Sequence, residues 1–247
     1  MTGPEEFCGK YITMKFKDQK IVIAGGTSGI GLATAQYFSS EGAFVTVTGR
    51  DAQKVAAAQA EGLGAVVVDS SDRKALDAFF AAQGPVDHLV IAVGGSKGMG
   101  EFAGLSLTVL REGFDEKLWP QLATLQAALP VLKAGGSVTM ITGSASRLRQ
   151  PGISGLAAIN GALELMVPVL AQELRSVRIN AVSPGVVDTP WWNFLPAEGR
   201  GAAFAQFTAN IPAARESRPE EIADVIGFLA GNAYMTGKVV GVDGGLA

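Results

Sequence analysis

A chain of 247 residues that is 48% hydrophobic and 17% charged has enough apolar material for one large α/β domain. The formal net charge of −3 offers no general attraction for nucleic acid or an anionic membrane, and we expect none of the apolar runs to span a bilayer. A single cysteine, Cys8, and a single histidine, His88, exclude an internal disulfide and argue against a metal site. Because the first residues lack the pattern of a secretory signal, we expect a cytoplasmic protein that acts on a small molecule.

Residues 1–17 show no sustained periodicity, so we interpret them as an N-terminal extension and residues 18–247 as one domain. Apolar runs predict strands at 21–23, 44–48, 65–68, 88–93, 137–141, 178–182 and 239–242. Helices are predicted at 32–38, 51–60, around 76–80, at 110–132 with a kink at Pro120, at 156–174 with an interruption at Pro168, and at 219–229. Residues 190–215 are less regular, as expected for a mobile flap over a pocket. This alternation predicts a single-domain, doubly wound parallel sheet of the Rossmann type with helices on both faces.

A glycine-rich turn, residues 24–31, joins the first predicted strand to the first helix. Such a turn brings backbone N–H groups and the positive end of a helix dipole toward a phosphate, and side chains in place of the glycines would hinder the approach. We therefore interpret it as a seat for a pyrophosphate. Glycine and hydroxyl residues also follow the later strands, at 94–100, 142–144 and 183–185, where open parallel sheets bind their ligands.

These features resemble the short-chain dehydrogenase/reductase family from about Lys20 to Ala247. The resemblance rests on the spacing Gly25-x-x-x-Gly29-Ile30-Gly31, on Asp69, and on the segments at 184–189, 219–223 and 241–245. It implies a nicotinamide cofactor and a homodimer or homotetramer formed through the long helices and the C-terminal segment. It also implies the cofactor-binding residues Gly25, Thr27, Ser28, Gly29, Ile30, Gly31, Arg50, Asp69, Ser70, Gly94, Pro184, Gly185, Val187 and Thr189. In this scheme Asp69 and Ser70 lie beside the adenine, Gly94 beside the ribose, and Val187 and Thr189 beside the nicotinamide carboxamide.

The end of the second strand indicates which cofactor is bound. An acidic residue there would accept hydrogen bonds from the ribose hydroxyls and repel a 2′-phosphate, but the sequence has Gly49 and Arg50. A guanidinium can pair with a phosphate through two charge-assisted hydrogen bonds, so we predict NADP(H). Thr27, Ser28 and Lys54 would supplement these contacts. The alternative is that Arg50 is only a solvated loop cation.

The chain departs from the family at the residues that transfer protons. The resemblance implies a tyrosine that acts as acid and base and a lysine four residues later, assisted by a serine and an upstream asparagine. Alignment places Leu156 at the tyrosine and Asn160 at the lysine, and counting back from 126–130 places Lys117 at the asparagine. The serine is present as Ser144.

Ser144, Lys117 and Asn160 are therefore the candidate catalytic residues. Ser144 can bind a carbonyl or hydroxyl oxygen, or it can simply satisfy the backbone at a strand end. Lys117 can donate or relay a proton if burial depresses its pKa, or it can be an exposed helix cation. Arg147, and likewise Arg149 and Gln150, can hold an anionic substrate or form a plain surface loop.

Two functions of different classes follow from this pattern. The first is an atypical NADP(H)-dependent oxidoreductase that reduces a small carbonyl compound, or oxidises the alcohol, with a non-standard proton donor. The alternative is a non-catalytic NADP(H)-binding sensor or regulatory protein. Non-redox chemistry in the same pocket, such as elimination or isomerisation, is a third possibility.

Overall fold

The computed structural model describes residues 14–247, so the expectations for Cys8 and most of the N-terminal extension lie outside the described residues. Its centre is a 7-stranded parallel sheet in the order β3-β2-β1-β4-β5-β6-β7. The strands are β1 (Lys20–Ala24), β2 (Phe44–Gly49), β3 (Gly64–Val67), β4 (Val86–Ile91), β5 (Leu132–Ile141), β6 (Arg178–Pro184) and β7 (Val239–Val242). The predicted doubly wound α/β class is confirmed.

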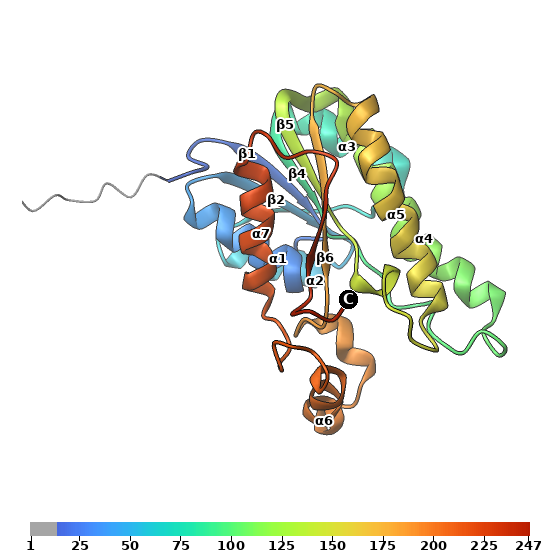
Figure 1. Ribbon diagram of the computed structural model, residues 1–247. Helices are drawn as coiled ribbons and strands as arrows, with labels where there is room; N and C mark the ends of the chain where they lie inside the picture. The colour runs from blue at the N-terminus through green and yellow to red at the C-terminus, as the bar shows by residue number, and fades with distance from the viewer. Residues whose placement is uncertain (1–13) are drawn as a thin grey trace, which may run out of the picture.

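Helices cover both faces of this sheet (Figure 1). One face packs against α1 (Gly29–Ser40), α2 (Ala52–Ala60) and α7 (Pro219–Gly231). The other packs against α3 (Arg73–Gln83), α4 (Leu107–Ala128) and α5 (Ser154–Glu173). Short 3₁₀ helices lie at η1 (Leu129–Val131), η2 (Ser144–Ser146) and η3 (Pro190–Phe194).

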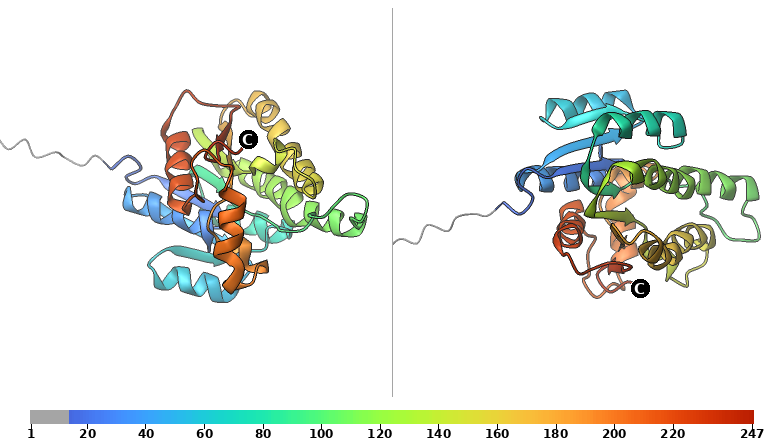
Figure 2. Two further views of the ribbon diagram at one scale, coloured as in Figure 1. Left: turned by 60° about the horizontal axis from the view of Figure 1, so that its bottom comes forward. Right: turned by 90° about the horizontal axis from the view of Figure 1, so that it is seen from above.

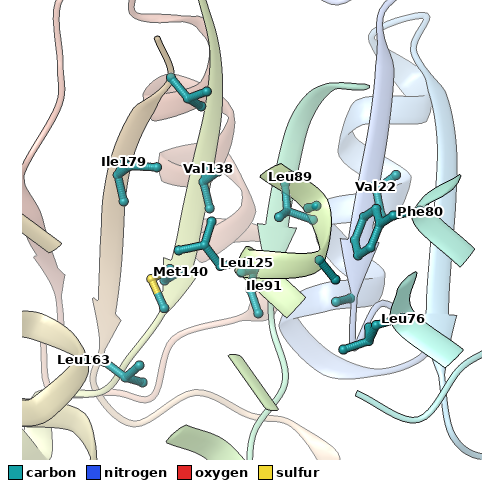
Figure 3. Packing of buried hydrophobic residues seen from close by; sticks show 14 of the residues in the cluster. Val22, Leu76, Phe80, Leu89, Ile91, Leu125, Val138, Met140, Leu163 and Ile179 are labelled. Carbon is teal, nitrogen blue, oxygen red and sulfur yellow. The ribbon is translucent and has the colours of Figure 1, made fainter. Parts of the chain in front are cut away.

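Alternating side chains along each strand supply both layers of the core. Val22 packs toward α3 and α4, whereas its neighbours Ile21 and Ile23 pack toward α1 and α7, and all three are fully buried. Figure 3 shows the layer between the sheet and helices α3, α4 and α5. In it, side chains from neighbouring strands face the helices: Val22, Leu89, Val138 and Ile179. The apolar runs of the sequence are therefore explained by burial on both faces.

Both long helices continue through their prolines, so the interruption predicted at Pro168 is wrong. By length and apolar composition, α5 would reach across a bilayer, contrary to our expectation from the sequence. Its Ile159, Leu163 and Val167 are nevertheless fully buried against the sheet, which accounts for much of that apolar character.

Two segments are more regular than the sequence predicted. Phe16, at the end of the predicted extension, is buried and makes an edge-to-face contact with Phe38 at 4.8 Å between ring centroids. The predicted flap contains η3 and a further helix, α6 (Ala197–Thr208), which lies beyond the carboxyl ends of the strands (Figure 2). Trp192 of η3 packs edge-to-face against Phe204 and at a tilt against Phe207 of α6, at centroid distances of 5.4 and 5.2 Å, so aromatic packing orders this segment.

Candidate functional site

The glycine turn lies at the point where the strand order of the sheet reverses, between the ends of β1 and β4. Gly25 has a φ of +77°, and a Cβ on it would lie 2.8 Å from the carbonyl carbon of Ala92, directly after β4. Ser28 occupies the N-cap position of α1, but its side chain makes no capping hydrogen bond. The first N–H groups of α1 and the Ser28 hydroxyl are thus available to a phosphate.

The ends of β2 and β3 form a polar corner beside this turn. A Cβ on Gly49 would lie 2.7 Å from Thr27 Oγ1, so the Thr27 side chain reaches the end of β2 next to Arg50. Asp69 accepts hydrogen bonds from the Ser71 N–H at 2.8 Å and the Ser71 hydroxyl at 2.7 Å. These bonds hold the pKa of Asp69 below its usual value, and the charge of Arg50 acts in the same direction. None of the ion pairs within residues 14–247 involves Arg50, which leaves its charge for an anion.

The segment after β6 closes over the same edge. A Cβ on Gly29 would lie 3.2 Å from Thr189 Cβ, so Thr189 contacts the glycine turn directly. Val187 is buried, and its carbonyl oxygen accepts a hydrogen bond from Trp192 Nε1 at 2.9 Å. Gly94 has open space where a side chain would project. Backbone N–H groups, hydroxyls and the Arg50 guanidinium along a glycine-lined edge fit a dinucleotide phosphate.

Lys117 and Asn160 come together from two different helices. Lys117 Nζ, on α4, donates hydrogen bonds to Asn160 Oδ1 of α5 at 2.8 Å and to the Thr142 carbonyl oxygen at 2.9 Å. Burial lowers the pKa of Lys117 to about 8, and the charge of Glu164 opposes this shift. The alternative of a solvated helix cation is therefore wrong.

Ser144 begins η2, immediately after the Thr142-Gly143 pair at the end of β5. The residue is buried, and its carbonyl oxygen accepts the N–H groups of Arg147 and Leu148. Within residues 14–247 its hydroxyl has no hydrogen-bond partner. The alternative role, in which this hydroxyl satisfies the backbone, is not the observed one.

Glu164 is a residue of the site that the motif comparison overlooked. Its Oε1 accepts hydrogen bonds from the hydroxyls of Thr142 at 2.8 Å and Ser183 at 2.7 Å, and its Oε2 accepts one from Ser146 at 2.7 Å. The side chain is only 12% exposed. The available signal was a carboxylate in the middle of an apolar helix, four residues after Asn160, a spacing that puts both side chains on one helix face.

Arg147 is an exposed residue that pairs with two carboxylates of the protein. Its guanidinium lies 3.6 Å from Glu164 Oε2 and 3.4 Å from Asp243 Oδ2. Its charge is therefore shared between two carboxylates. Arg149 and Gln150 are exposed.

Hydrogen bonds join the flap to the segments that follow β4 and β6. Trp191 Nε1 donates a hydrogen bond to the carbonyl oxygen of Gly95 at 2.9 Å, joining η3 to the glycine loop after β4. Arg200 of α6 bonds to Asp188 Oδ1 and to the Thr189 carbonyl oxygen at 2.8 and 2.5 Å. These contacts bring segments after β4 and β6 together at one edge of the sheet, although the sequence predicted only an irregular flap.

A family model described as enoyl-(acyl carrier protein) reductase matches residues 24–247. The chain is 31% identical to a 3-oxoacyl-[acyl-carrier-protein] reductase from Thermotoga maritima over 94% of this chain and 99% of the relative. A solved small-chain dehydrogenase in complex with NADPH has a TM-score of 0.82 at 31% identity, covering 93% of this chain and 99% of the other. A short-chain oxidoreductase from Pseudomonas aeruginosa PAO1, described as containing an atypical catalytic center, has a TM-score of 0.84 at 29% identity, covering 93% and 97%. The chain is therefore a member of the short-chain dehydrogenase/reductase family.

Proposed function

We propose that this protein is an NADP(H)-dependent oxidoreductase that reduces a small carbonyl compound, or oxidises the corresponding alcohol, with Lys117 as its proton donor. The observation that carries this proposal is the contact between Lys117 Nζ and Asn160 Oδ1. Residue 160 aligns with the lysine of the family, so a lysine from α4 brings an ammonium group to the place that a lysine of α5 occupies elsewhere. Lysine and asparagine have in effect exchanged helices.

The NADP(H) assignment has separate support. The glycine turn offers N–H groups to the pyrophosphate, and Arg50, without an ion-pair partner within residues 14–247, stands beside Thr27 at the end of β2 for the 2′-phosphate. A solved relative binds NADPH. Bound there, the cofactor would supply the hydride for the reduction.

The protein side of the reaction then needs an oxygen contact and a proton. The unpartnered Ser144 hydroxyl donates a hydrogen bond to the carbonyl oxygen and stabilises the negative charge that develops on it. Lys117, with a pKa of about 8, is protonated at neutral pH and acidic enough to give its proton to that oxygen, directly or through a water. Asn160 holds the ammonium in place, and bulk water returns the proton after turnover.

A panel of carbonyl compounds assayed by loss of NADPH absorbance tests this proposal. We expect Ser144→Ala to lower kcat about 100-fold, the usual effect of removing one donor to a developing oxyanion. Ser176→Ala, which removes a serine hydroxyl from an exposed loop, is the control and should leave kcat unchanged. Absence of turnover with every carbonyl, or turnover indifferent to Ser144→Ala, would reject the mechanism.

Leu156 favours the non-catalytic sensor as a second candidate, because an apolar side chain stands where the family's tyrosine aligns. Calorimetric titration with NADPH separates the two functions. A sensor binds NADPH tightly and consumes none with any carbonyl, whereas the reductase does both.

A further inference from the structure

Two segments that are distant in sequence, residues 142–147 and the end of β6 at Ser183, converge on the Glu164 carboxylate. Its two oxygens accept the hydroxyls of Thr142 at the end of β5, Ser183 at the end of β6 and Ser146 in η2. Arg147, directly after η2, supplies a guanidinium at 3.6 Å. A carboxylate that is 12% exposed and bonded on both oxygens has a fixed position, because moving it would leave a desolvated charge without partners.

Thr142 links Glu164 to the catalytic groups. Its hydroxyl donates to Glu164, while its carbonyl oxygen accepts from Lys117 Nζ. Ser146 extends the link, because it shares the single turn of η2 with Ser144. Glu164 thus holds one residue that binds Lys117 and another that belongs to the Ser144 turn.

The charges around the site are few and can be named. Lys117 of α4 is linked to Glu164 through Thr142, Arg147 lies 3.6 Å from Glu164 Oε2, and Asp243 of the C-terminal segment pairs with Arg147. We propose that Glu164 is a positioning residue of this site, which fixes the turn that carries Ser144 and places its negative charge one residue, Thr142, away from the Lys117 ammonium. This inference rests on the proposed function, since it assigns Glu164 a part in the same proton transfer.

Glu164→Gln separates the charge from the geometry. The glutamine amide oxygen can still accept the hydroxyls of Thr142 and Ser183, and its Nε2 can donate to Ser146 Oγ. The negative charge that raises the pKa of Lys117 is lost, so the ammonium becomes a stronger acid that deprotonates at lower pH. Glu173→Gln makes the same change at an exposed position of the same helix and serves as the matched control.

The pH profile of kcat for carbonyl reduction and a ¹³C NMR titration of the lysine Cε signals are measured on both variants. The Lys117 signal is assigned by its absence in Lys117→Met. For Glu164→Gln we expect the alkaline limb of the profile and the Lys117 titration to move together to lower pH. The value of kcat at pH 8 should fall about tenfold while the KM for NADPH is unchanged. Glu173→Gln should behave as wild type.

The inference would be overturned if a folded Glu164→Gln protein kept both the alkaline limb of its kcat profile and the Lys117 titration at the wild-type pH. A loss of kcat without a shift of that limb and that titration would also overturn it. If wild type reduces no carbonyl, the proposed function fails, but the NMR titration still decides whether Glu164 controls Lys117. If Glu164→Gln does not fold, Ser146→Ala decides instead. The Ser146→Ala variant keeps the Glu164 charge but removes the hydrogen bond that holds the Ser144 turn. We therefore expect kcat to fall several-fold while the alkaline limb of its pH profile stays in place. An unchanged kcat would reject the role of Glu164.

Discussion

The two halves of the candidate site are built in different ways. The cofactor edge, from the glycine turn to the end of β3, depends on backbone shape: Gly25 fits against Ala92, and Gly29 fits against Thr189. The proton-transfer side, around β5 and α5, depends on side chains that contact one another, such as Lys117 with Asn160 and Glu164 with Thr142. Backbone shape tolerates few substitutions, whereas a side-chain network can be rebuilt when two residues change together.

The exchange of lysine and asparagine between helices that we propose illustrates how such rebuilding would work. An ammonium group needs a particular location but not a particular Cα, and the length of the lysine side chain lets α4 supply it as well as α5. If the two halves are separable in this way, substitutions on the proton-transfer side should change turnover and leave nucleotide binding intact, while those at the cofactor edge should do the reverse.

The largest expected effect is that of Lys117→Met on turnover. Removing the proton donor should lower kcat for carbonyl reduction by about 10²- to 10⁴-fold. In wild type the same group should make kcat fall as the pH rises through about 8, because the ammonium is the acid and its pKa is about 8. A pH profile of kcat and a calorimetric NADPH titration check both points. A parallel loss of NADPH affinity would show that the two halves are not separable.

Gly31→Ala should damage the cofactor edge. A Cβ at this position would collide with the carbonyl oxygen of Gly25, so the turn must deform. We expect NADPH affinity to fall about 100-fold and the free energy of unfolding to fall by about 1–3 kcal/mol. Gly161→Ala is the control, because nothing lies within 4 Å of its new methyl group. That variant should bind NADPH normally, and chemical denaturation should show equal or greater stability.

Arg50→Ala should discriminate between the two nicotinamide nucleotides. Loss of a charge-assisted contact to the 2′-phosphate should weaken NADPH binding by about tenfold and leave NADH binding unchanged. Calorimetric titration with each nucleotide measures this directly. Equal affinity of wild type for the two nucleotides would reject the NADP(H) assignment.

Leu165→Glu should affect assembly and neither half of the site. Leu165 and Val169 of α5 and Trp119 of α4 are 78%, 54% and 57% exposed, a concentration of apolar side chains that favours the proposed homodimer or homotetramer. Light scattering should give a lower mass for the variant, with NADPH affinity preserved. A wild-type protein that is monomeric at micromolar concentration would contradict this prediction.

Much of the fold could be predicted from the sequence because its signals are local. Each strand core is an apolar run, as at Ile21–Ile23, and such runs are visible without knowing what covers them. The first half of β5 was missed because residues 132–136 include two glycines and are largely exposed. The helix α6 was missed because Gly199 and Gly201 weaken its intrinsic propensity, and packing against Trp192 holds it instead.

The candidate site divides in the same way. The glycine turn and Arg50 could be recognised because spacing along the chain fixes their positions relative to the strand ends. The burial of Lys117 and the bonds of Glu164 depend on residues 18 to 43 positions away, which no local pattern reveals. Sequence alone therefore located the candidates on this side but not the partners that determine their chemistry.

The ion pair between Arg147 and Asp243 has a practical consequence for handling the protein. Asp243 lies close to Ala247, and the neighbouring Gly244 and Gly245 pack tightly against Ile211, Pro212 and Ala213 of the flap. A purification tag fused after Ala247 would disturb a segment that contacts the flap and also contacts Arg147, which pairs with Glu164. An amino-terminal tag avoids this, so preparations tagged at opposite ends should differ in kcat more than in nucleotide affinity.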